Sequence, residues 1–314
     1  MKKRRRKFLT RDDVELTLLS LPTLAWYVLL TLLPMVGILL AFKSYRLSPG
    51  KGFFYSLFAS EWKGWDNFKF LFLRKDTFFI IFKTLAYNLV FIALGAIIPV
   101  TLAIMIFNLR SRRAAKAYQT MMFLPYFLSW VVISYFIFAF LGPSSGYLSR
   151  MLEGGSFAGF NFYGSKANGF WTVFLVFLYL WKNVGYTMVV YLAAITSEDT
   201  TCYEAAIVDG ASKFQQAIYI TLPSLKPVVI VMVMMSLAKV FNSDFGLFYQ
   251  ATRNAAALYP ATQTLDVLVY NMLMQSNDIS MAAAASFIQS VAGFVLVMLV
   301  NWVLKKIDSD NAFI

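Results

Sequence analysis

The sequence has no histidine and a single cysteine, Cys202, in 314 residues. These absences exclude an internal disulfide, zinc sites built from histidine and cysteine, and Ser-His-Asp or Cys-His catalytic groups. No GxxxxGK[ST] pattern occurs, so the chain lacks a P-loop for nucleotide. Charge is also scarce, because Asp, Glu, Lys and Arg make up 14% of the residues, against about a quarter in a soluble domain. We therefore expect no catalysis and no cofactor in this chain.

Apolar residues take the place of the missing charge, at 59% of the sequence. Charge-poor runs of about 18 or more residues are candidates for transmembrane helices. They predict an all-α, polytopic membrane protein with six transmembrane helices in a single domain, residues 16–314, after a basic tail, residues 1–15. The predicted spans are residues 16–42, 84–109, 117–141, 170–195, 227–241 and 281–304.

The net charge of +12 follows the pattern of a membrane protein rather than a nucleic-acid-binding protein. Basic residues gather in the N-terminal tail and in the hinge 110–116, and such clusters flank spans on the cytoplasmic side and contact anionic lipids. This places both termini and residues 198–227 in the cytoplasm. Residues 43–83 then lie outside, although they hold eight Lys or Arg residues, which is unusually basic for that side. The stretch WDNFKFLF within it suggests an interfacial helix.

The polar segment 198–227 interrupts the apolar runs and predicts two short helices at an angle. Thr201-x-x-Glu204 matches a capping box at the start of the first helix, and Gly210 suits a left-handed residue at its end. Ser212-x-x-Gln215 is a second capping box, and we expect Pro223 to end the second helix.

A family resemblance is carried by this segment. Glu204-Ala205-Ala206, then Gly210, Ile220 and Leu222-Pro223 resemble the EAA loop of binding-protein-dependent ABC transporter permeases. WDNFKFLF, FLPYFLSWVV and LWKNVGY resemble the maltose-type permeases, and among them the branch that handles polysaccharide fragments such as aldouronate or rhamnogalacturonan oligosaccharides. The resemblance covers residues 16 to 314 and implies a bundle of the type I importer kind, in a bacterial plasma membrane.

The resemblance also implies a division of labour. The first short helix would be the coupling helix, which docks on a cytoplasmic ATPase. Two ATPase subunits would bind ATP and Mg²⁺, a second permease, expected to be a different chain, would pair with this one, and an extracellular solute-binding lipoprotein would deliver carbohydrate. The residues that match the family's coupling loop are Glu204, Ala205, Ala206, Asp209, Gly210, Ile220, Leu222 and Pro223.

A substrate pathway is expected where polar side chains fall within or beside the spans, because such residues usually face a cavity. A lysine near a span end can instead extend to the interface, which applies to Lys239, whereas Lys182 is deep enough for a cavity or bundle role. Both lysines are candidate counter-charges for an acidic sugar. The candidates are Lys182, Asn183, Lys239, Asn242, Asp244, Trp181 and Asn88. Aromatic residues compatible with a sugar site are Trp130, Tyr135, Tyr179 and Tyr186, although most of the 55 aromatic residues are expected to face lipid.

Two other functions remain open from the residues. A permease for amino acids or peptides would share the coupling loop. An autonomous secondary carrier would show internal repeats with paired broken helices and an ionic relay, and we find no convincing repeat. An intramembrane enzyme would need clustered acids, bases or metal ligands, which the spans lack.

Overall fold

Long apolar helices dominate the structure, a computed structural model that describes residues 11–73, 75–143, 146–151 and 160–307. The first half contains α1 (Arg11–Tyr27), η1 (Val28–Leu32), η2 (Leu33–Phe42), β1 (Lys43–Ser44), α2 (Phe53–Ala59), β2 (Glu61–Trp62), η3 (Asp66–Phe68), α3 (Lys69–Leu73), α4 (Lys75–Phe107), α5 (Arg112–Phe123), η4 (Leu124–Phe127), α6 (Trp130–Leu141) and α7 (Tyr147–Met151). The second half contains η5 (Ser165–Ala167), α8 (Asn168–Ser197), α9 (Thr201–Val208), α10 (Lys213–Gln216), η6 (Ala217–Thr221), α11 (Leu222–Leu237), η7 (Gly246–Ala251), η8 (Ala256–Leu258), α12 (Tyr259–Thr262), α13 (Leu265–Met274) and α14 (Ile279–Ile307). Residues 1–10 of the predicted basic tail lie outside the described residues.

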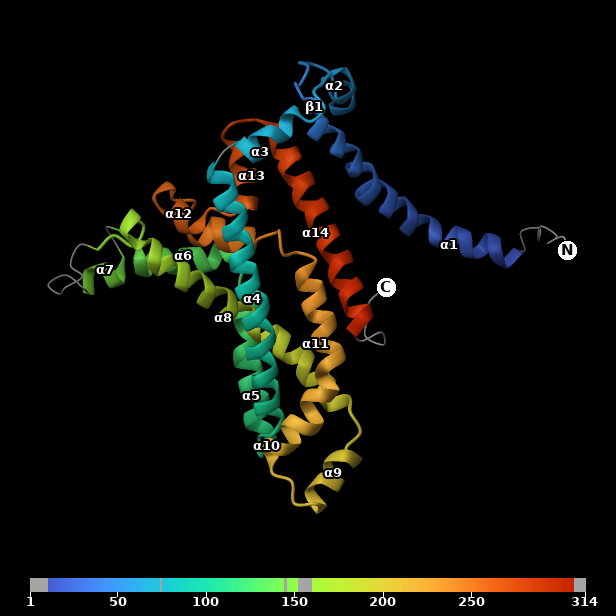
Figure 1. Ribbon diagram of the computed structural model, residues 1–314, viewed down its shortest axis with the longest axis vertical. Coiled ribbons are helices and arrows are strands. Elements are labelled where there is room, and N and C mark those ends of the chain that lie inside the picture. Colours follow the sequence, from blue (N-terminus) through green and yellow to red (C-terminus); the bar gives the residue numbers. More distant parts are fainter. Residues whose placement is uncertain (1–10, 74, 144–145, 152–159, 308–314) are drawn as a thin grey trace.

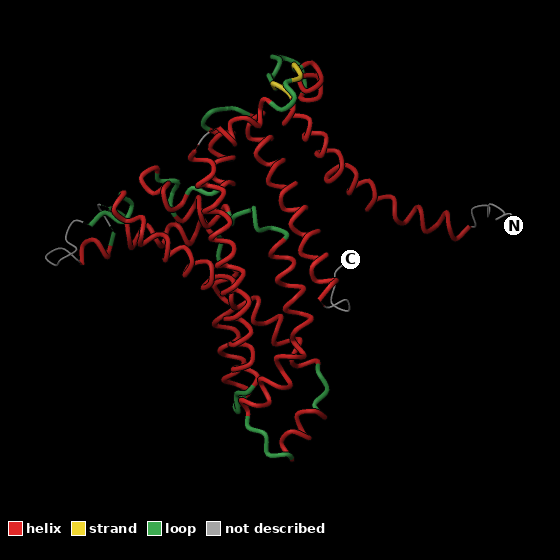
Figure 2. The backbone as a smooth tube through the Cα atoms, in the orientation of Figure 1, coloured by secondary structure: helices red, strands yellow, loops and turns green. Residues whose placement is uncertain are grey.

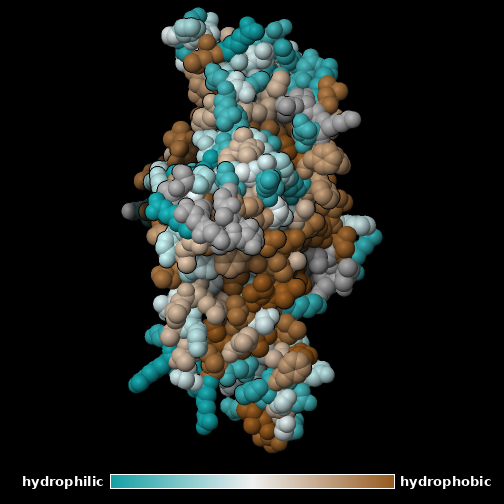
Figure 3. Space-filling model, turned by 90° about the vertical axis from the view of Figure 1, so that its left-hand side faces the viewer, coloured by the Kyte–Doolittle hydropathy of each residue, from teal (hydrophilic) through white to brown (hydrophobic). Residues whose placement is uncertain are grey.

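The bundle has two distinct ends. In Figure 1, α9 lies at the lower end and α2 at the upper end, and we call these the α9 end and the α2 end. Figure 3 shows apolar side chains across the middle of one face and polar ones towards both ends. That distribution fits a protein whose middle faces hydrocarbon and whose ends face water.

Within the described residues, five continuous helices are long and apolar enough to cross a membrane, and the number is six if a bent pair of helices counts as one span. The prediction of an all-α, multi-pass chain is therefore confirmed. The continuous spans are Asp12–Phe42, Asp76–Phe107, Ser165–Ser197, Lys213–Leu237 and Ile279–Val303. The second span begins at Asp76 rather than at Thr84, and Lys83 is accommodated inside the helix because its ammonium donates to the Tyr259 carbonyl at 2.9 Å.

The third predicted span, residues 117–141, is not one straight helix. It consists of Arg112–Phe127 and Trp130–Leu141, which meet at an angle of 93°. Pro125 lacks an amide donor, so the helix narrows to a 3₁₀ turn around it and stops. The new helix α6 then starts at Ser129, whose hydroxyl accepts from the Val132 N–H at 3.2 Å.

The fifth span differs more from its prediction. A continuous helix runs from Lys213 to Leu237, so residues 227–241 are the wrong bounds and Pro223 does not end the helix. The π turn η6 lies directly before this proline, and the Leu222 N–H donates to the Ala217 carbonyl across it. The π turn shifts the hydrogen-bond register just before Pro223, so the helix continues past the missing amide donor of this proline.

Packing is centred on the crossing of α4 and α8. One buried cluster lies towards the α2 end and includes Trp171, Phe91 and Phe248, and a second lies towards the α9 end and includes Met188 and Tyr191. Figure 2 shows loops gathered at the two ends, with an exception half-way up, where the chain leaves α11. Non-helical backbone at membrane depth is tolerated where protein buries it or where it lines a cavity. This connection is therefore a candidate functional segment.

The α1 arm (α1, η1 and η2) leaves the bundle instead of packing along it (Figure 1). Its most apolar window is only 11% buried, against 28% for the spans that contain α4 and α8. The arm is attached near Phe42, whose ring lies 5.4 Å from the ring of Phe287 on α14. This chain therefore leaves most of the arm exposed.

The α2 cap (residues 43–68) lies at the α2 end beyond the tops of α3 and α14 (Figure 1). Its two short strands pair antiparallel, with Lys43 opposite Trp62 and Ser44 opposite Glu61. The buried Asn67 amide donates to the carbonyls of Ala41 and Lys43 at 3.0 and 2.9 Å. These bonds fix the cap to the end of the arm.

Candidate coupling and translocation sites

The polar segment 198–227 forms the farthest projection at the α9 end (Figure 1). Most of its predicted coupling residues are accessible. Exposed are Glu204, Ala205, Asp209, Gly210, Leu222 and Pro223, and half-buried are Ala206 and Ile220. The tip of α9 also presents Ile207 and Val208, which are 56% and 87% exposed. Exposed β-branched side chains at the tip of a projecting helix suit insertion into an apolar groove of another protein.

The end of α9 is specified by Gly210. Its φ of +78° lies in the left-handed region, and its N–H donates to the Ile207 carbonyl at 3.1 Å, while Ala211 donates to Ala206 at 2.8 Å. This pair of bonds is a Schellman motif, which satisfies the carbonyls at the end of the helix. The prediction of a left-handed residue at Gly210 is confirmed.

The start of α9 differs from the prediction. The helix is capped by Thr200 rather than Thr201, without a side-chain cap bond, so a Thr201–Glu204 capping box is wrong. The Asp199 carboxylate instead accepts from the N–H and the hydroxyl of Thr201 at 3.0 and 2.7 Å, because a charged acceptor two residues upstream competes for these donors. The same bonds hold the pKa of Asp199 below its ordinary value. The Glu204 side chain remains exposed on the helix surface.

The second capping box is present as predicted. The Ser212 hydroxyl accepts from the Gln215 N–H at 3.3 Å, and the Gln215 side chain accepts from the Ser212 N–H at 2.7 Å. The buried Gln216 amide donates to the Ala211 carbonyl at 2.9 Å. The turn between α9 and α10 is therefore held from both sides.

Tyr203 connects α9 to the bundle, a role that no pattern in the sequence indicates. Its hydroxyl lies 3.0 Å from the Thr221 hydroxyl on η6, and its ring centroid lies 5.6 Å from that of Phe107 at the end of α4. Tyr203 therefore joins α9 to two spans. Only the fold reveals that α4 ends beside this tyrosine.

Lys182 lies at the break in the third span. Its ammonium donates to the carbonyls of Tyr126 and Leu128 at 2.8 and 2.6 Å. The break leaves these carbonyls without helical partners, and a cation is a strong donor for them. Of the two predicted roles for Lys182, a bundle role is thus supported by its contacts.

Trp130 and Asp244 link the break to the connection after α11. The Trp130 indole N–H donates to the Asp244 carboxylate at 2.9 Å, and the Leu247 N–H donates to its other oxygen at 3.2 Å. A side chain at Gly246 would meet the Trp130 ring at 2.2 Å, so the bond depends on that glycine. The carboxylate that was predicted to line a pathway therefore also fixes the helix break.

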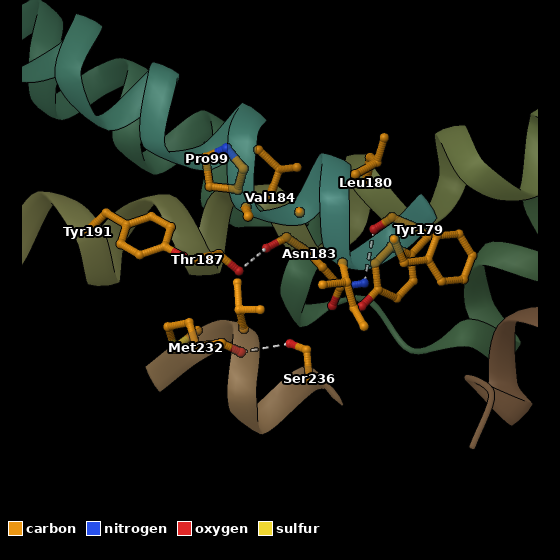
Figure 4. Close-up of a pocket in the computed structure, with 14 residues that line it drawn as sticks. Pro99, Tyr179, Leu180, Asn183, Val184, Thr187, Tyr191, Met232 and Ser236 are labelled. Carbon is orange, nitrogen blue, oxygen red and sulfur yellow. Dashed lines mark hydrogen bonds between the residues drawn. The ribbon is translucent and has the colours of Figure 1, made fainter. Parts of the chain in front are cut away.

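Asn88 contacts the connection after α11, and Asn183 lies beside that connection. The Asn88 amide donates to the carbonyls of Val240 and Asn242 at 2.7 and 2.9 Å, which anchors the connection to α4. Asn183 lines a cavity of about 70 Å³ between α4, α8 and α11, together with Thr187 and Ser236 (Figure 4). That volume holds a few water molecules and no sugar ring. The space between the three helices is therefore too small for a sugar in this conformation.

The remaining candidates for a substrate pathway, Lys239, Asn242 and Trp181, do not line this cavity. Lys239 and Asn242 are exposed beside the end of α11. Trp181 is 41% exposed and borders apolar hollows between α8 and its neighbours α4, α5 and α6. Substrate contact by any of the seven candidates stays a prediction.

Asp266 is a further residue that the sequence did not single out. Its carboxylate accepts from the N–H and hydroxyl of Ser243, at 2.5 and 2.8 Å, and from the Gln289 amide of α14 at 3.1 Å. Thr84 of α4 accepts from the Leu265 N–H at 3.0 Å. Three helices, α4, α13 and α14, thus hold the connection after α11 in place.

Comparison with known proteins places this geometry in a family. Residues 95–309 match the family model described as the inner membrane component of binding-protein-dependent transport systems. Protein LplB of Bacillus subtilis (strain 168) is 30% identical over 96% of this chain and 92% of its own length. The polygalacturonan/rhamnogalacturonan transport system permease protein YteP of the same organism is 29% identical over 99% of this chain and 95% of its own length.

Solved structures agree with these relatives. A chain of a bacterial ABC transporter involved in the import of the acidic polysaccharide alginate superimposes with a TM-score of 0.80, at 28% identity, over 95% of this chain and 97% of its own. A second structure shows the bacterial alginate transporter in complex with an alginate pentasaccharide-bound periplasmic protein, with the same TM-score and identity.

Proposed function

This chain belongs to the family of inner membrane components of binding-protein-dependent transport systems, and on that premise we propose that it is a permease subunit of an ATP-driven carbohydrate importer. The observation that carries the proposal is α9, a projecting helix with an accessible apolar tip and a specified turn at Gly210. The exposed face suits an ATPase subunit, which would bind ATP and Mg²⁺ in place of this chain. The Tyr203 contacts with α4 and η6 supply a route from that docking site into the spans.

Carbohydrate is the substrate class that the relatives favour. YteP is named for polygalacturonan and rhamnogalacturonan, and the structural neighbour imports alginate, which are acidic polymers. Fragments of such polymers, delivered by an extracellular solute-binding protein, are the proposed cargo. A permease for amino acids or peptides has no comparable support, and an autonomous carrier leaves the exposed tip of α9 without a role.

Orientation follows from the basic clusters and the docking requirement. An ATPase works in the cytoplasm, so the α9 end faces the cytoplasm, and the α2 end faces outward. Both termini then lie on the cytoplasmic side, as the basic tail also requires. The sparsely buried α1 arm supports a second permease, which together with lipid would cover it.

The test is purification of the tagged chain from its host in mild detergent, followed by mass spectrometry and reconstitution. We expect a second permease and an ATPase to co-purify, and uptake of acidic oligosaccharide to require ATP and the binding protein. Recovery of the chain alone, with uptake that needs no ATP, would favour the carrier.

Cys202 provides a direct test of docking at α9. It is exposed on that helix and is the only cysteine of the chain. A maleimide is expected to label it rapidly in the isolated permease and at least about tenfold more slowly in the complex with the ATPase, since a docked helix excludes the reagent. Equal labelling in both states would contradict docking by this surface.

A further inference from the structure

An open groove lies between α4, α8 and α12, towards the α2 end of the bundle (Figure 1). Its volume is about 670 Å³, within the range of sites that hold small molecules. We call it the α4–α12 groove. Its rim is accessible, since Phe79 and Phe82 are 66% and 63% exposed, and Val90 and Val176 continue the apolar lining. The candidates for coupling and for the substrate pathway lie elsewhere, so the proposed function gives this groove no role.

A positive charge lies in the groove. Lys83 lines it and is half-buried, and its ammonium donates to the Tyr259 carbonyl of α12 at 2.9 Å. A lysine ammonium has three N–H donors, so it can donate to further acceptors. Among the residues that the structure describes, no carboxylate lies within 4.0 Å of this ammonium. A half-buried charge without a partner is costly beside lipid, and an anionic group from outside the chain would satisfy it.

Lys83 lies level with the end of a neighbouring span. Its partner Tyr259 begins α12, and the Ala261 N–H of that helix donates to the side chain of Asn168 at 3.2 Å. Asn168 is the first residue of α8. The ends of spans lie at the level of lipid headgroups, and the turns beyond them enter the hydrocarbon. Val90 lies two turns farther along α4 than Lys83 and therefore borders the acyl chains.

Asp76 adds a negative charge farther from the centre of the membrane. It precedes Lys83 by two helical turns, so both side chains lie on one face of α4, and both line the groove. Asp76 is exposed and lies about 10 Å closer to the α2 end along the helix. From the hydrocarbon outward, the groove thus presents apolar walls, a cation and then an anion. A phospholipid with an amino headgroup presents acyl chains, a phosphate and then an ammonium in the same order.

This order of groups favours a lipid over a sugar or a helix of another protein. A bound sugar needs a hydrogen-bonding partner for each buried hydroxyl, whereas most of the groove lining is apolar. A helix would have to bring an acid to Lys83, and acidic side chains are rare in spans. A lipid phosphate already lies at the headgroup level, so it reaches Lys83 without entering the hydrocarbon.

We propose that the α4–α12 groove binds a zwitterionic phospholipid with a primary ammonium, such as phosphatidylethanolamine. The Lys83 ammonium donates to the phosphate, and the lipid ammonium donates to the Asp76 carboxylate, both as charge-assisted bonds. One acyl chain lies along Val90 and Val176. The inference requires only that these helices span a bilayer, so it does not depend on the proposed cargo.

A lipid in this position braces α12 against the spans, because α4, α8 and α12 all line the groove. The protein contributes two bonds to the same joint. The Lys83 ammonium donates to the Tyr259 carbonyl, and the Tyr87 hydroxyl donates to the Ala261 carbonyl at 3.1 Å. The bound lipid is therefore expected to raise the unfolding temperature of the transporter, since a ligand that binds only the folded state stabilises it.

The experiment measures which lipid the complete transporter retains. The purified complex is incubated in mild detergent with an equimolar mixture of synthetic phosphatidylethanolamine and phosphatidylglycerol that carry the same acyl chains. The excess is washed away, and mass spectrometry quantifies the retained lipids. The wild type is expected to retain at least about fivefold more phosphatidylethanolamine than phosphatidylglycerol. Because the acyl chains are identical, this ratio reports recognition of the headgroup.

Two variants remove the site in different ways. Lys83→Met removes the charge that holds the phosphate, and Ala86→Phe fills the groove but keeps Lys83 and its bond to Tyr259. Each is expected to retain at least about fivefold less phosphatidylethanolamine than the wild type. Lys63→Met and Val173→Phe are the matched controls, and both should retain the wild-type amount. Lys63 is an exposed lysine of the α2 cap, Val173 is 71% exposed on α8, and neither lines the groove.

Asp76→Asn tests the partner of the lipid ammonium. The variant keeps Lys83 and the apolar walls, so it should still retain phospholipid, but its preference for phosphatidylethanolamine is expected to fall to about twofold or less. An unchanged preference in this variant would overturn the role of Asp76. Equal retention of both lipids by the wild type would overturn recognition of a zwitterion.

Thermal unfolding separates loss of the site from loss of the fold. Added phosphatidylethanolamine is expected to raise the unfolding temperature of the wild type and both controls, but not that of Lys83→Met or Ala86→Phe. Wild-type lipid retention by both of these variants would overturn the groove as the binding site. Retention of neither lipid by the wild-type complex would overturn the proposal and leave the importer unaffected.

Discussion

At the scale of single residues, glycines serve two different purposes in this chain. Gly185 permits close approach, since a side chain there would lie 1.9 Å from the Met122 carbonyl oxygen of α5. Gly210 has open space around it, and its positive φ is what only a few residue types adopt. The first glycine is required by packing and the second by backbone conformation.

Gly185→Ala is expected to destabilise the permease by about 1–3 kcal/mol, because the clashing atom is backbone and α5 must move away from α8. The measurement is thermal unfolding in detergent. Gly95→Ala is the matched control, since it lies in a span with no atom within 4 Å of the added carbon. Equal stability of the two variants would show that α5 and α8 do not approach as described.

Gly210→Val is expected to abolish coupled uptake while insertion remains normal. A β-branched residue is strained by about 1–2 kcal/mol in the left-handed region, so the turn rearranges and α9 points elsewhere. Substrate-stimulated ATPase activity and uptake in proteoliposomes would both fall. Gly210→Asn should retain most uptake, because asparagine tolerates that conformation. Unchanged uptake by the Gly210→Val variant would argue against a coupling role for this turn.

At the scale of elements, the broken third helix depends on Lys182. Its two bonds to the Tyr126 and Leu128 carbonyls close the gap that Pro125 opens. Trp130 begins the next helix and reaches Asp244 across the bundle. The break, the connection after α11 and the lysine therefore form one unit.

Lys182→Met is expected to lower stability by about 1–3 kcal/mol, because it removes two charge-assisted hydrogen bonds to the carbonyls at the helix break. Uptake of acidic and neutral oligosaccharides would fall to a similar extent, and Lys182→Arg would restore part of it. Thermal unfolding and parallel uptake assays provide the readout. A loss confined to acidic sugars would identify Lys182 as a counter-charge for substrate instead.

The elements also show where sequence reasoning succeeds and where it stops. Hydropathy located the five continuous spans and the apolar stretch of the bent pair, and Gly210 and the Ser212–Gln215 box follow from local backbone chemistry. The Thr201–Glu204 box failed because the Asp199 carboxylate accepts from the Thr201 N–H, which the Glu204 side chain would have needed, and the Pro223 stop failed because a π turn absorbs the proline. The contacts of Tyr203 and Asp266 could not be predicted from the sequence, since their partners lie on segments that only the tertiary fold brings together.

At the scale of the whole molecule, the α1 arm makes the chain incomplete by itself. Its apolar residues Leu19 and Trp26 are 76% and 70% exposed, a larger apolar surface than an isolated soluble chain tolerates. Lipid would cover part of this arm, and contacts with a second permease would hold the arm in one position. The arm is thus where assembly can be examined.

A cysteine introduced as Leu19→Cys in a Cys202→Ser background is expected to cross-link to the second permease with a short bifunctional reagent in native membranes. Phe72→Cys is the control, as Phe72 is equally exposed but lies on α3 away from the arm. Mass spectrometry of the cross-linked product identifies the partner. Labelling without any cross-link at position 19 would assign the arm to lipid alone.

The uninterrupted helix from Lys213 to Leu237 acts as a lever. Its 25 residues span about 37 Å at 1.5 Å per residue. A rotation of about 10° about its α9 end would carry the far end through about 6 Å, more than one helical turn. Asn88 ties that far end to α4, so either those bonds break or α4 moves with it. In the proposed importer, a small rotation at the α9 end would therefore become a larger displacement at the far end of this helix, in proportion to its length.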